Sequence, residues 1–205
     1  AIIDGGAQFA GEVMSPLRRV GDEHGSHVVP GKGVVTPPGF REAYGKYREG
    51  GWASMSIDEA WGGQGLPHSL SIVFHEMCQT ANLAFFAIVT LTHGAIRAIE
   101  AHAAPELQMR YLPKMASGEW TGTMCLTEAH AGSDVGMVRT RAEPQADGTY
   151  RIHGTKIFIT WSDQDIPPNI VHLVLARLPG APAGPKGISL FIVPKFIPDT
   201  QGNPG

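Results

Sequence analysis

Cysteine is scarce in this 205-residue sequence. The two cysteines, Cys78 and Cys125, do not form a C-x-x-C pair. This argues against a disulfide framework and a cysteine-based zinc site, and it fits a reducing, cytoplasmic environment. Both thiols lie in apolar-rich segments, so we expect them to be small buried side chains.

An excess of charge of one sign is also missing. The 16 Lys and Arg residues nearly balance the 19 Asp and Glu residues, for a net charge of −3. No basic footprint for nucleic acid or an anionic membrane is therefore present. The apolar stretch 81–99 is interrupted by residues such as Asn82 and Arg97, whereas a membrane span needs about 18 or more mostly apolar residues. We expect a helix buried in a bundle and no membrane partner.

Several motifs of known chemistry are incomplete. His75-Glu-Met-Cys-Gln79 begins like a zinc-protease helix but has Gln where the second His belongs, and no G-x-S-x-G occurs. The Gly-rich stretches 31–33 and 62–65 complete no phosphate-binding pattern, so we interpret them as turns. His24 and His27 have no supporting cluster of ligands. We expect no metal site.

What is present is an ordinary globular composition with many turn formers. Hydrophobic residues make up 42% and charged residues 17%, with 26 glycines and 16 prolines but no G-x-y period. These numbers argue against disorder and against collagen, and they favour a soluble, loop-rich fold. A folded chain of 205 residues can form one domain or two small ones.

Hydrophobic periodicity divides the chain near Ser117. Before it, apolar residues recur every three or four positions, and after it they alternate or run as in strands. Asp147-Gly148 between two such runs predicts a hairpin in which both turn residues have positive φ. We predict an α+β protein with a helical domain at 1–117 and an antiparallel β-domain at 118–205. The predicted helices are 9–20 (with a kink at Pro16), 40–47, 70–81, 83–101 and 105–115; the predicted strands are 120–126, 138–142, 149–153, 156–160, 170–178 and 188–193.

One segment combines a strand with an unusual loop. Met124 to Leu126 ends a strand, and Thr127 to Asp134 is rich in small and hydroxyl-bearing residues. Such a loop offers backbone N–H groups to an anion or to the pyrimidine edge of a flavin. A tight structural turn is the alternative interpretation. Glu128 and Asp134 are candidates either for acid–base chemistry or for ordinary capping.

The same segment resembles the signature of acyl-CoA dehydrogenases. Met-Cys-Leu-Thr-Glu-x-x-Ala-Gly-Ser-Asp at 124–134 is followed by Asp-Gly-x-Tyr-x-Ile-x-Gly-Thr-Lys-Ile-Phe-Ile-Thr at 147–160. Two earlier segments also resemble the family pattern, in the same order along the chain: Gly-Gly-Gln-Gly-Leu-Pro at 62–67 and Tyr-Leu-Pro at 111–113. The segment 169–191 is similar to a longer-chain branch that includes the 3-methylmercaptopropionyl-CoA dehydrogenases.

The resemblance implies a helical domain, a middle β-domain and a C-terminal helical bundle. It also implies FAD as cofactor and α,β-desaturation of an acyl-CoA, in which a carboxylate takes the α proton and hydride leaves the β carbon for the flavin. The partners implied for a full-length protein are the acyl-CoA substrate of β-oxidation, an electron-transfer acceptor and further copies of itself in a homo-oligomer.

The family pattern assigns site residues to this chain. Leu126 and Thr127 would face the flavin ring near Met124, and Gly132 and Ser133 would lie near its diphosphate, with Ser133 also near the pantetheine arm of the substrate. A second group would pack on the ring or line its N5 edge; these residues are Phe158, Ile159 and Thr160. From their position on the central helix, we also place Phe86 and Thr90 at the acyl pocket, with plain core packing as the alternative.

The departures from the family pattern limit what the chain is expected to do. Ala129 replaces the usual proline, and the bulky Trp161 follows Thr160, where it would narrow or cover the flavin site. The family's catalytic base lies on the C-terminal bundle, which has no counterpart in this sequence. We therefore expect a fragment with an incomplete β-domain, no catalytic residue, and weak or absent FAD binding. The alternative is a natural truncated member that acts as a non-catalytic binding or assembly module.

Overall fold

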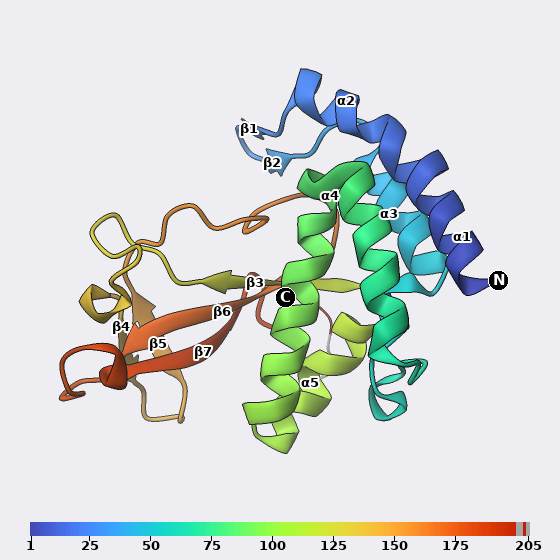
Figure 1. Cartoon of the computed structure of the whole chain (residues 1–205). Helices are drawn as coiled ribbons and strands as arrows, with labels where there is room; N and C mark the ends of the chain where they lie inside the picture. The colour runs from blue at the N-terminus through green and yellow to red at the C-terminus, as the bar shows by residue number, and fades with distance from the viewer. Residues whose placement is uncertain (200–202, 204–205) are drawn as a thin grey trace.

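The computed structural model describes residues 1–199 and 203, and it places a helical part beside a sheet (Figure 1). The helices are α1 (Ile2–Phe9), α2 (Ser15–His24), α3 (Phe40–Glu49), α4 (His68–His102) and α5 (Pro105–Ala116), with a π-helical stretch, Ala10–Met14, joining α1 to α2. The strands are β1 (His27–Val29), β2 (Gly33–Val35), β3 (Trp120–Cys125), β4 (Arg141–Pro144), β5 (Tyr150–His153), β6 (Asn169–Arg177) and β7 (Ile188–Pro194). The end of the second predicted domain, at 205, lies outside the described residues.

Helix α4 is a helical hairpin. Asn82 has φ −159° and ψ 85°, so the helical backbone is interrupted there. The rings of His75 and His93 lie 5.2 Å apart, although a straight helix would separate them by about 27 Å at 1.5 Å per residue. The Asn82 side chain accepts a hydrogen bond from the Phe85 N–H over 3.1 Å and so caps the second half. The two predicted helices, 70–81 and 83–101, are confirmed, and Figure 1 draws them side by side.

By length and composition alone, α4 is able to cross a membrane. Half of its most apolar window is buried inside the protein, and the bend at Asn82 turns the second half back on the first. A core position explains its hydrophobicity, as the sequence predicted for 81–99.

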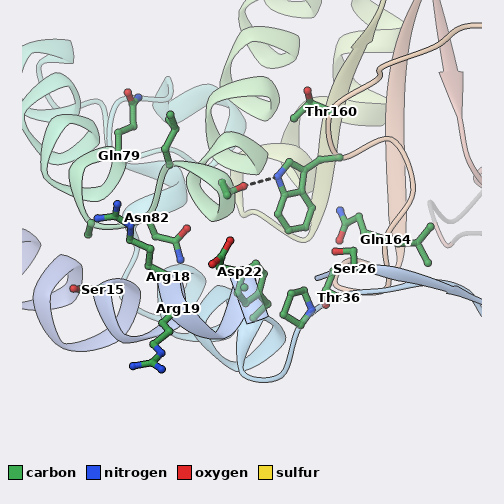
Figure 2. Close-up of a pocket in the computed structure, with 18 of the residues that line it drawn as sticks. Ser15, Arg18, Arg19, Asp22, Ser26, Thr36, Gln79, Asn82, Thr160 and Gln164 are labelled. Carbon is green, nitrogen blue, oxygen red and sulfur yellow. Dashed lines mark hydrogen bonds between the residues drawn. The ribbon is translucent and has the colours of Figure 1, made fainter. Parts of the chain in front are cut away.

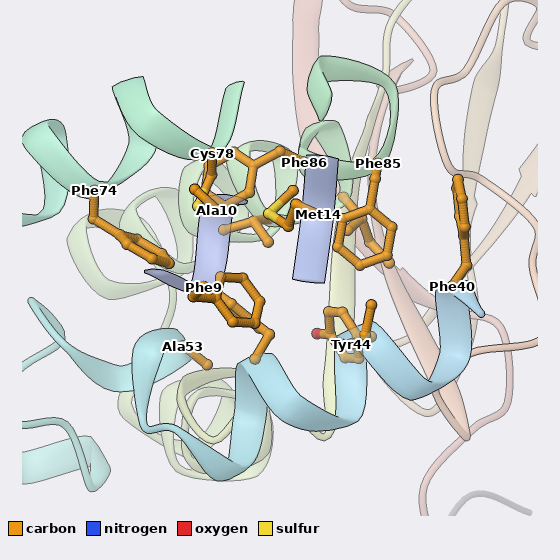
Figure 3. Close-up of a cluster of buried hydrophobic side chains, with 14 of the residues drawn as sticks. Phe9, Ala10, Met14, Phe40, Tyr44, Ala53, Phe74, Cys78, Phe85 and Phe86 are labelled. Atoms are coloured by element: carbon orange, nitrogen blue, oxygen red, sulfur yellow. The ribbon is translucent and has the colours of Figure 1, made fainter. Parts of the chain in front are cut away.

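Two apolar clusters hold the fold together. The first lies among the helices and includes Phe9, Met14, Phe74 and Phe85 (Figure 3). The second joins α4 and α5 to the sheet, and Trp120, at the start of β3, is completely buried in it. Because α4 and α5 bury apolar faces against the sheet, the helical part and the sheet share an interface.

Strand β6 is the centre of the sheet. Strand β3 pairs with it in parallel from Trp120 opposite Asn169, and β7 pairs antiparallel on its other edge. Strand β4 follows β3 along the same edge and carries β5. The α+β class is confirmed, but the prediction of an antiparallel β-domain was wrong for β3 and β4, which both pair with β6 in parallel. A long crossover from 126 to 168 allows the parallel pairing, which a tight turn would not.

The hairpin of β4 and β5 forms where predicted, with a different turn. Only Gly148 has positive φ (81°), and its N–H donates to the Gln145 carbonyl. The Asp147 carboxylate instead accepts from the N–H and hydroxyl of Thr149. The Asp147 side chain thereby stabilises a type I turn that is followed by a left-handed glycine. Only Gly148 then needs a positive φ, and Asp147 does not.

Two other details differ from the sequence predictions. The predicted strand 156–160 is absent from the described chain, because this segment leaves the sheet and crosses to the helical part. The short hairpin of β1 and β2 was not predicted; Pro30-Gly31 between two Val-Val pairs is the signal that marks it. The division of domains at residue 117 stays a prediction.

Candidate functional site

The two segments that carry the predicted flavin contacts lie side by side. The Ile157 N–H donates to the Thr127 carbonyl over 2.9 Å. The Lys156 ammonium donates to the Leu126 carbonyl over 3.1 Å. The loop after β3 and the segment after β5 therefore form one surface, although about thirty residues separate them in sequence.

This surface is apolar where it is most exposed. Phe158 is 90% exposed, and Met124, at 40%, is the one exposed side chain of β3. The side chains of Leu126, Thr127 and Ile159 are half-buried. A fully exposed phenyl ring costs hydrophobic free energy unless something covers it, so this arrangement is typical of a binding surface.

The polar groups expected at the site are exposed and uncommitted. Gly132, Ser133 and Thr160 are exposed, and a Cβ added to Gly132 would meet nothing within 4 Å. Among residues 1–199 and 203, no hydrogen bond engages the hydroxyls of Thr127, Ser133 or Thr160. These groups remain available to a ligand.

Backbone strain is concentrated in the same segment. Phe158 and Trp161, each with φ 56°, are the non-glycine residues of the described chain with positive φ. A bulky residue in this conformation costs about 1–2 kcal/mol, and such strain clusters at functional sites.

Glu128 organises the loop and does not act as an acid or base. Its carboxylate accepts from the Arg139 and Thr140 N–H groups at 2.8 and 2.9 Å, from the Thr140 hydroxyl at 2.5 Å and from Lys156 at 2.8 Å. Burial alone would raise its pKa, but Lys156 and the three other donors lower the pKa to about 2. A carboxyl that stays ionised in this way exchanges no proton near neutral pH.

Asp134 also has a structural role. Its carboxylate accepts from the Gly136 N–H over 3.0 Å and caps the short 3-10 helix Val135–Met137. Of the two interpretations left open for Glu128 and Asp134, capping and loop fixation therefore hold.

Trp161 packs against the helical part of the chain. Its indole N–H donates to the Ala84 carbonyl over 2.9 Å, and its ring stacks on Phe40 at 6.3 Å between centroids. Trp161 lines the same cavity as Ile159 and Thr160, so the expectation that it narrows or covers the flavin site stays a prediction.

A cavity of about 1090 Å³ lies beside Trp161, between α2, α3, the bend of α4 and the segment 159–164. Figure 2 shows Arg18 and Asn82 on one side of it and Thr160 and Gln164 on the other. Local sequence patterns do not predict this cavity, because its walls come from four segments that lie far apart in the chain.

The two residues predicted at the acyl pocket are placed differently. Phe86 is fully buried in the helical cluster, 5.1 Å from the ring of His75, which agrees with the alternative of plain core packing. Its position on α4 points it toward the first half of the hairpin. Thr90 is exposed, and its hydroxyl donates to the Phe86 carbonyl.

The remaining polar candidates have ordinary surroundings. His75 packs on His93 and Phe86, and burial followed by the neighbouring His68 lowers its pKa. The described residues contain no group of three His, Cys, Asp or Glu side chains able to hold a metal ion. Both cysteines are buried, as predicted, and burial raises the pKa of Cys78 to about 12.

Comparisons with known proteins agree along the whole chain. The family model for the N-terminal domain of acyl-CoA dehydrogenases matches residues 7–119, and the model for their middle domain matches residues 123–203. A 3-methylmercaptopropionyl-CoA dehydrogenase of Ruegeria pomeroyi is 45% identical over 95% of this chain and 33% of its own length. A butyryl-CoA dehydrogenase of Syntrophomonas wolfei is 39% identical over 100% of this chain and 34% of its own length.

Solved structures agree with this fold. The structure of an acyl-CoA dehydrogenase from Bacillus anthracis in complex with FAD superposes with a TM-score of 0.74 at 25% identity. It is matched over 94% of this chain and 30% of its own. The chain spans about a third of the length of the curated relatives above. On these matches, and on the loop that follows β3, the chain belongs to the acyl-CoA dehydrogenase family.

Proposed function

We propose that this chain forms part of an FAD-dependent enzyme that introduces an α,β double bond into acyl-CoA thioesters. The observation that carries the proposal is the exposed Phe158, held in a strained left-handed conformation beside the small-residue loop after β3. Family membership supplies the reaction class, and the relatives named above act on short acyl-CoA thioesters by their names.

The residues present fit a flavin. An exposed thioether and an exposed phenyl ring, on Met124 and Phe158, suit the flat apolar face of an isoalloxazine. The free hydroxyls of Thr127 and Thr160 suit its polar edge, and the open backbone at Gly132 and Ser133 suits a diphosphate. FAD would supply the acceptor for the hydride that leaves the substrate.

The carboxylate base of the reaction is proposed to lie outside these 205 residues. Glu128 is ion-paired and Asp134 caps a 3-10 helix, so both carboxylates near the loop already have structural partners. We therefore propose that this chain alone does not turn over and binds FAD weakly. Acyl-CoA, an electron-transfer acceptor and a homo-oligomeric assembly are the proposed partners of the larger protein.

For the substrate, the proposal retains Thr90 and Ser133 and drops Phe86. Thr90 lies on the exposed side of the second half of α4, and Ser133 lies on the exposed loop. Thr90 is proposed to meet the acyl chain, and Ser133 the pantetheine arm.

Flavin titration tests the cofactor. FAD fluorescence is followed as the 205-residue chain is added, beside a Phe158→Ala variant. We expect weak quenching that the variant reduces further. A tight, stoichiometric complex would contradict the weak-binding proposal, and equal quenching by both proteins would contradict the role of Phe158.

An activity assay tests the reaction. The protein encoded by the whole reading frame is purified, and its absorbance is recorded as acyl-CoA thioesters of graded length are added. We expect a yellow protein that loses its colour with a preferred thioester. A colourless whole protein that binds acyl-CoA without reaction would favour the non-catalytic module instead.

A further inference from the structure

We propose that Glu128 is a positioning residue which, through Lys156, fixes the two segments of the predicted flavin surface, 124–128 and 156–160, relative to each other. That these segments face a flavin rests on the proposed function. That Glu128 and Lys156 hold them in place concerns the chain without cofactor, so one claim can be wrong while the other is right.

Glu128 gathers three parts of the β-domain. Its carboxylate accepts from the Arg139 and Thr140 N–H groups and from the Thr140 hydroxyl just before β4, and from Lys156 after β5. The His130 Nε2 atom, on the same loop, lies 3.4 Å from the Glu128 carboxylate. A reciprocal pair of backbone bonds between Glu128 and Ala131 closes the turn that follows. One side chain thus holds the loop, β4 and the segment after β5.

The ion pair is nearly dry. The side chain of Glu128 is 4% exposed and that of Lys156 is 10% exposed, with 2.8 Å between the charged atoms. Removing one partner of such a pair leaves a buried charge without its counter-ion, which is more costly than losing both. The geometry of the two segments is therefore strongly coupled to the presence of both ions.

Lys156 also orients a peptide group. Its ammonium donates to the Leu126 carbonyl as well as to Glu128, so that carbonyl points toward the buried pair. In a trans peptide the following N–H points the opposite way, and the described chain has no cis peptide bond. The Thr127 N–H is therefore aimed away from the ion pair, while the Thr127 carbonyl is held by Ile157.

The same anchor explains how Phe158 keeps its conformation. Lys156 and Ile157 fix the chain just before Phe158, and the Trp161 indole fixes it just after. A left-handed residue persists only when its surroundings determine it. Between these two anchors, Phe158 stays exposed and keeps its strained backbone conformation.

Hydrogen exchange of the 205-residue chain without flavin tests the proposal. The variants are Glu128→Gln, Lys156→Met and the double variant. Glu143→Gln is the matched control, because Glu143 is an exposed carboxylate on β4 that pairs with Arg141 over 2.8 Å. Exchange is read at the Ile157 amide and, for the core, at the amides of β6.

We expect each single variant to speed exchange at Ile157 about tenfold or more, with β6 and the control unchanged. The double variant is expected to fall short of the product of the two single effects, because it leaves no unpaired buried ion. If Glu128→Gln alone fails to fold, the double variant decides: faster exchange confined to Ile157 and its neighbours supports the proposal.

Two results would overturn it. One is unchanged Ile157 exchange in all three variants. The other is an increase spread equally over Ile157 and β6, which would mean a general loss of stability. FAD titration of the same proteins addresses the cofactor separately, so absent binding would count against the proposed function and leave the exchange result standing.

Discussion

The indole N–H of Trp161 donates to the carbonyl oxygen of Ala84 over 2.9 Å. This bond joins the segment after β5 to the first turn of the second half of α4. Stacking on Phe40 and an edge contact with Phe85 surround the ring on the helical side. Asp165 adds a second connection by accepting from the N–H and hydroxyl of Thr36.

Replacing this donor should weaken the junction measurably. Trp161→Phe keeps a ring against Phe40 but loses the hydrogen bond, so we expect a loss of about 1 kcal/mol in the free energy of unfolding. Urea unfolding followed by circular dichroism measures it. The control is Phe158→Leu, because Phe158 has the same left-handed conformation as Trp161 but an exposed side chain. This change should alter the free energy of unfolding by less than about 0.5 kcal/mol. Equal effects would contradict a role for the Trp161 bond.

Asn82 should be the best site to test the helical hairpin. Its side chain accepts from the Phe85 N–H and donates to the Met14 carbonyl. Asn82→Ala removes the cap and is expected to cost about 1–2 kcal/mol in unfolding free energy. Asn82→Ser keeps an uncharged acceptor for the cap and should lose less. If both variants were as stable as the parent chain, the cap would carry no weight in forming the bend.

The buried His93 predicts a loss of stability in mild acid. Burial, followed by the neighbouring His75, lowers its pKa from 6.5 to about 4, and its Nε2–H donates to the Ala53 carbonyl. The unfolded chain takes up this proton first as pH falls, so stability is lost from about pH 6.5 down to about pH 4 and then levels off. The shift corresponds to about 3 kcal/mol in total and about 2 kcal/mol by pH 5.

His93→Gln is the variant that checks the pH effect. A glutamine amide can still donate to the Ala53 carbonyl, but it does not titrate. Unfolding free energies between pH 7 and pH 5 should therefore fall less in this variant than in the parent chain. His27→Gln, at an exposed position on β1, should leave the slope as it is. A parallel slope in the His93 variant would refute the assignment.

Two glycines should respond in opposite directions. A Cβ at Gly122 on β3 would lie 2.6 Å from the Ala95 Cβ and 2.9 Å from the Met115 Cε, so Gly122→Ala should cost about 1–3 kcal/mol through overpacking. A Cβ at Gly94 on α4 would meet nothing within 4 Å. Gly94→Ala should therefore stabilise the helix by about 0.5–1 kcal/mol. Thermal unfolding of both variants decides, and a tolerated Gly122→Ala would mean that α4 and β3 can separate.

The sequence predicted the elements well where periodicity was strong. The interruption between 81 and 83, the helix at 105–115 and the strands that became β3, β6 and β7 all follow from local patterns. The parallel pairing of β3 with β6 does not, because it depends on which strands meet after a long connection. Local signals also missed that 156–160 leaves the sheet, since its run of apolar residues belongs to a segment that crosses from the sheet to the helical part.

The candidate site was predictable in part for the same reason. The family motif predicted flavin contacts in the loop after β3 and at Phe158, and in the structure Lys156 connects these two segments. For Phe86 the alternative of core packing stayed open, because helical periodicity does not say which face meets the other half of a hairpin. The contact of Trp161 with Ala84 links residues 77 positions apart, which no local pattern encodes.

The parallel pairing of β3 with β6 also sets the order in which the chain can fold. Thr123 and His172, neighbours across this pair, are 49 positions apart, so a long loop must close before either strand gains its partner. The hairpin of β4 and β5 lies inside that loop and can form early from local contacts. The segments around Glu128 and Lys156 flank this hairpin and are 28 positions apart, so the surface they build should gain protection after the hairpin and before β3 pairs with β6.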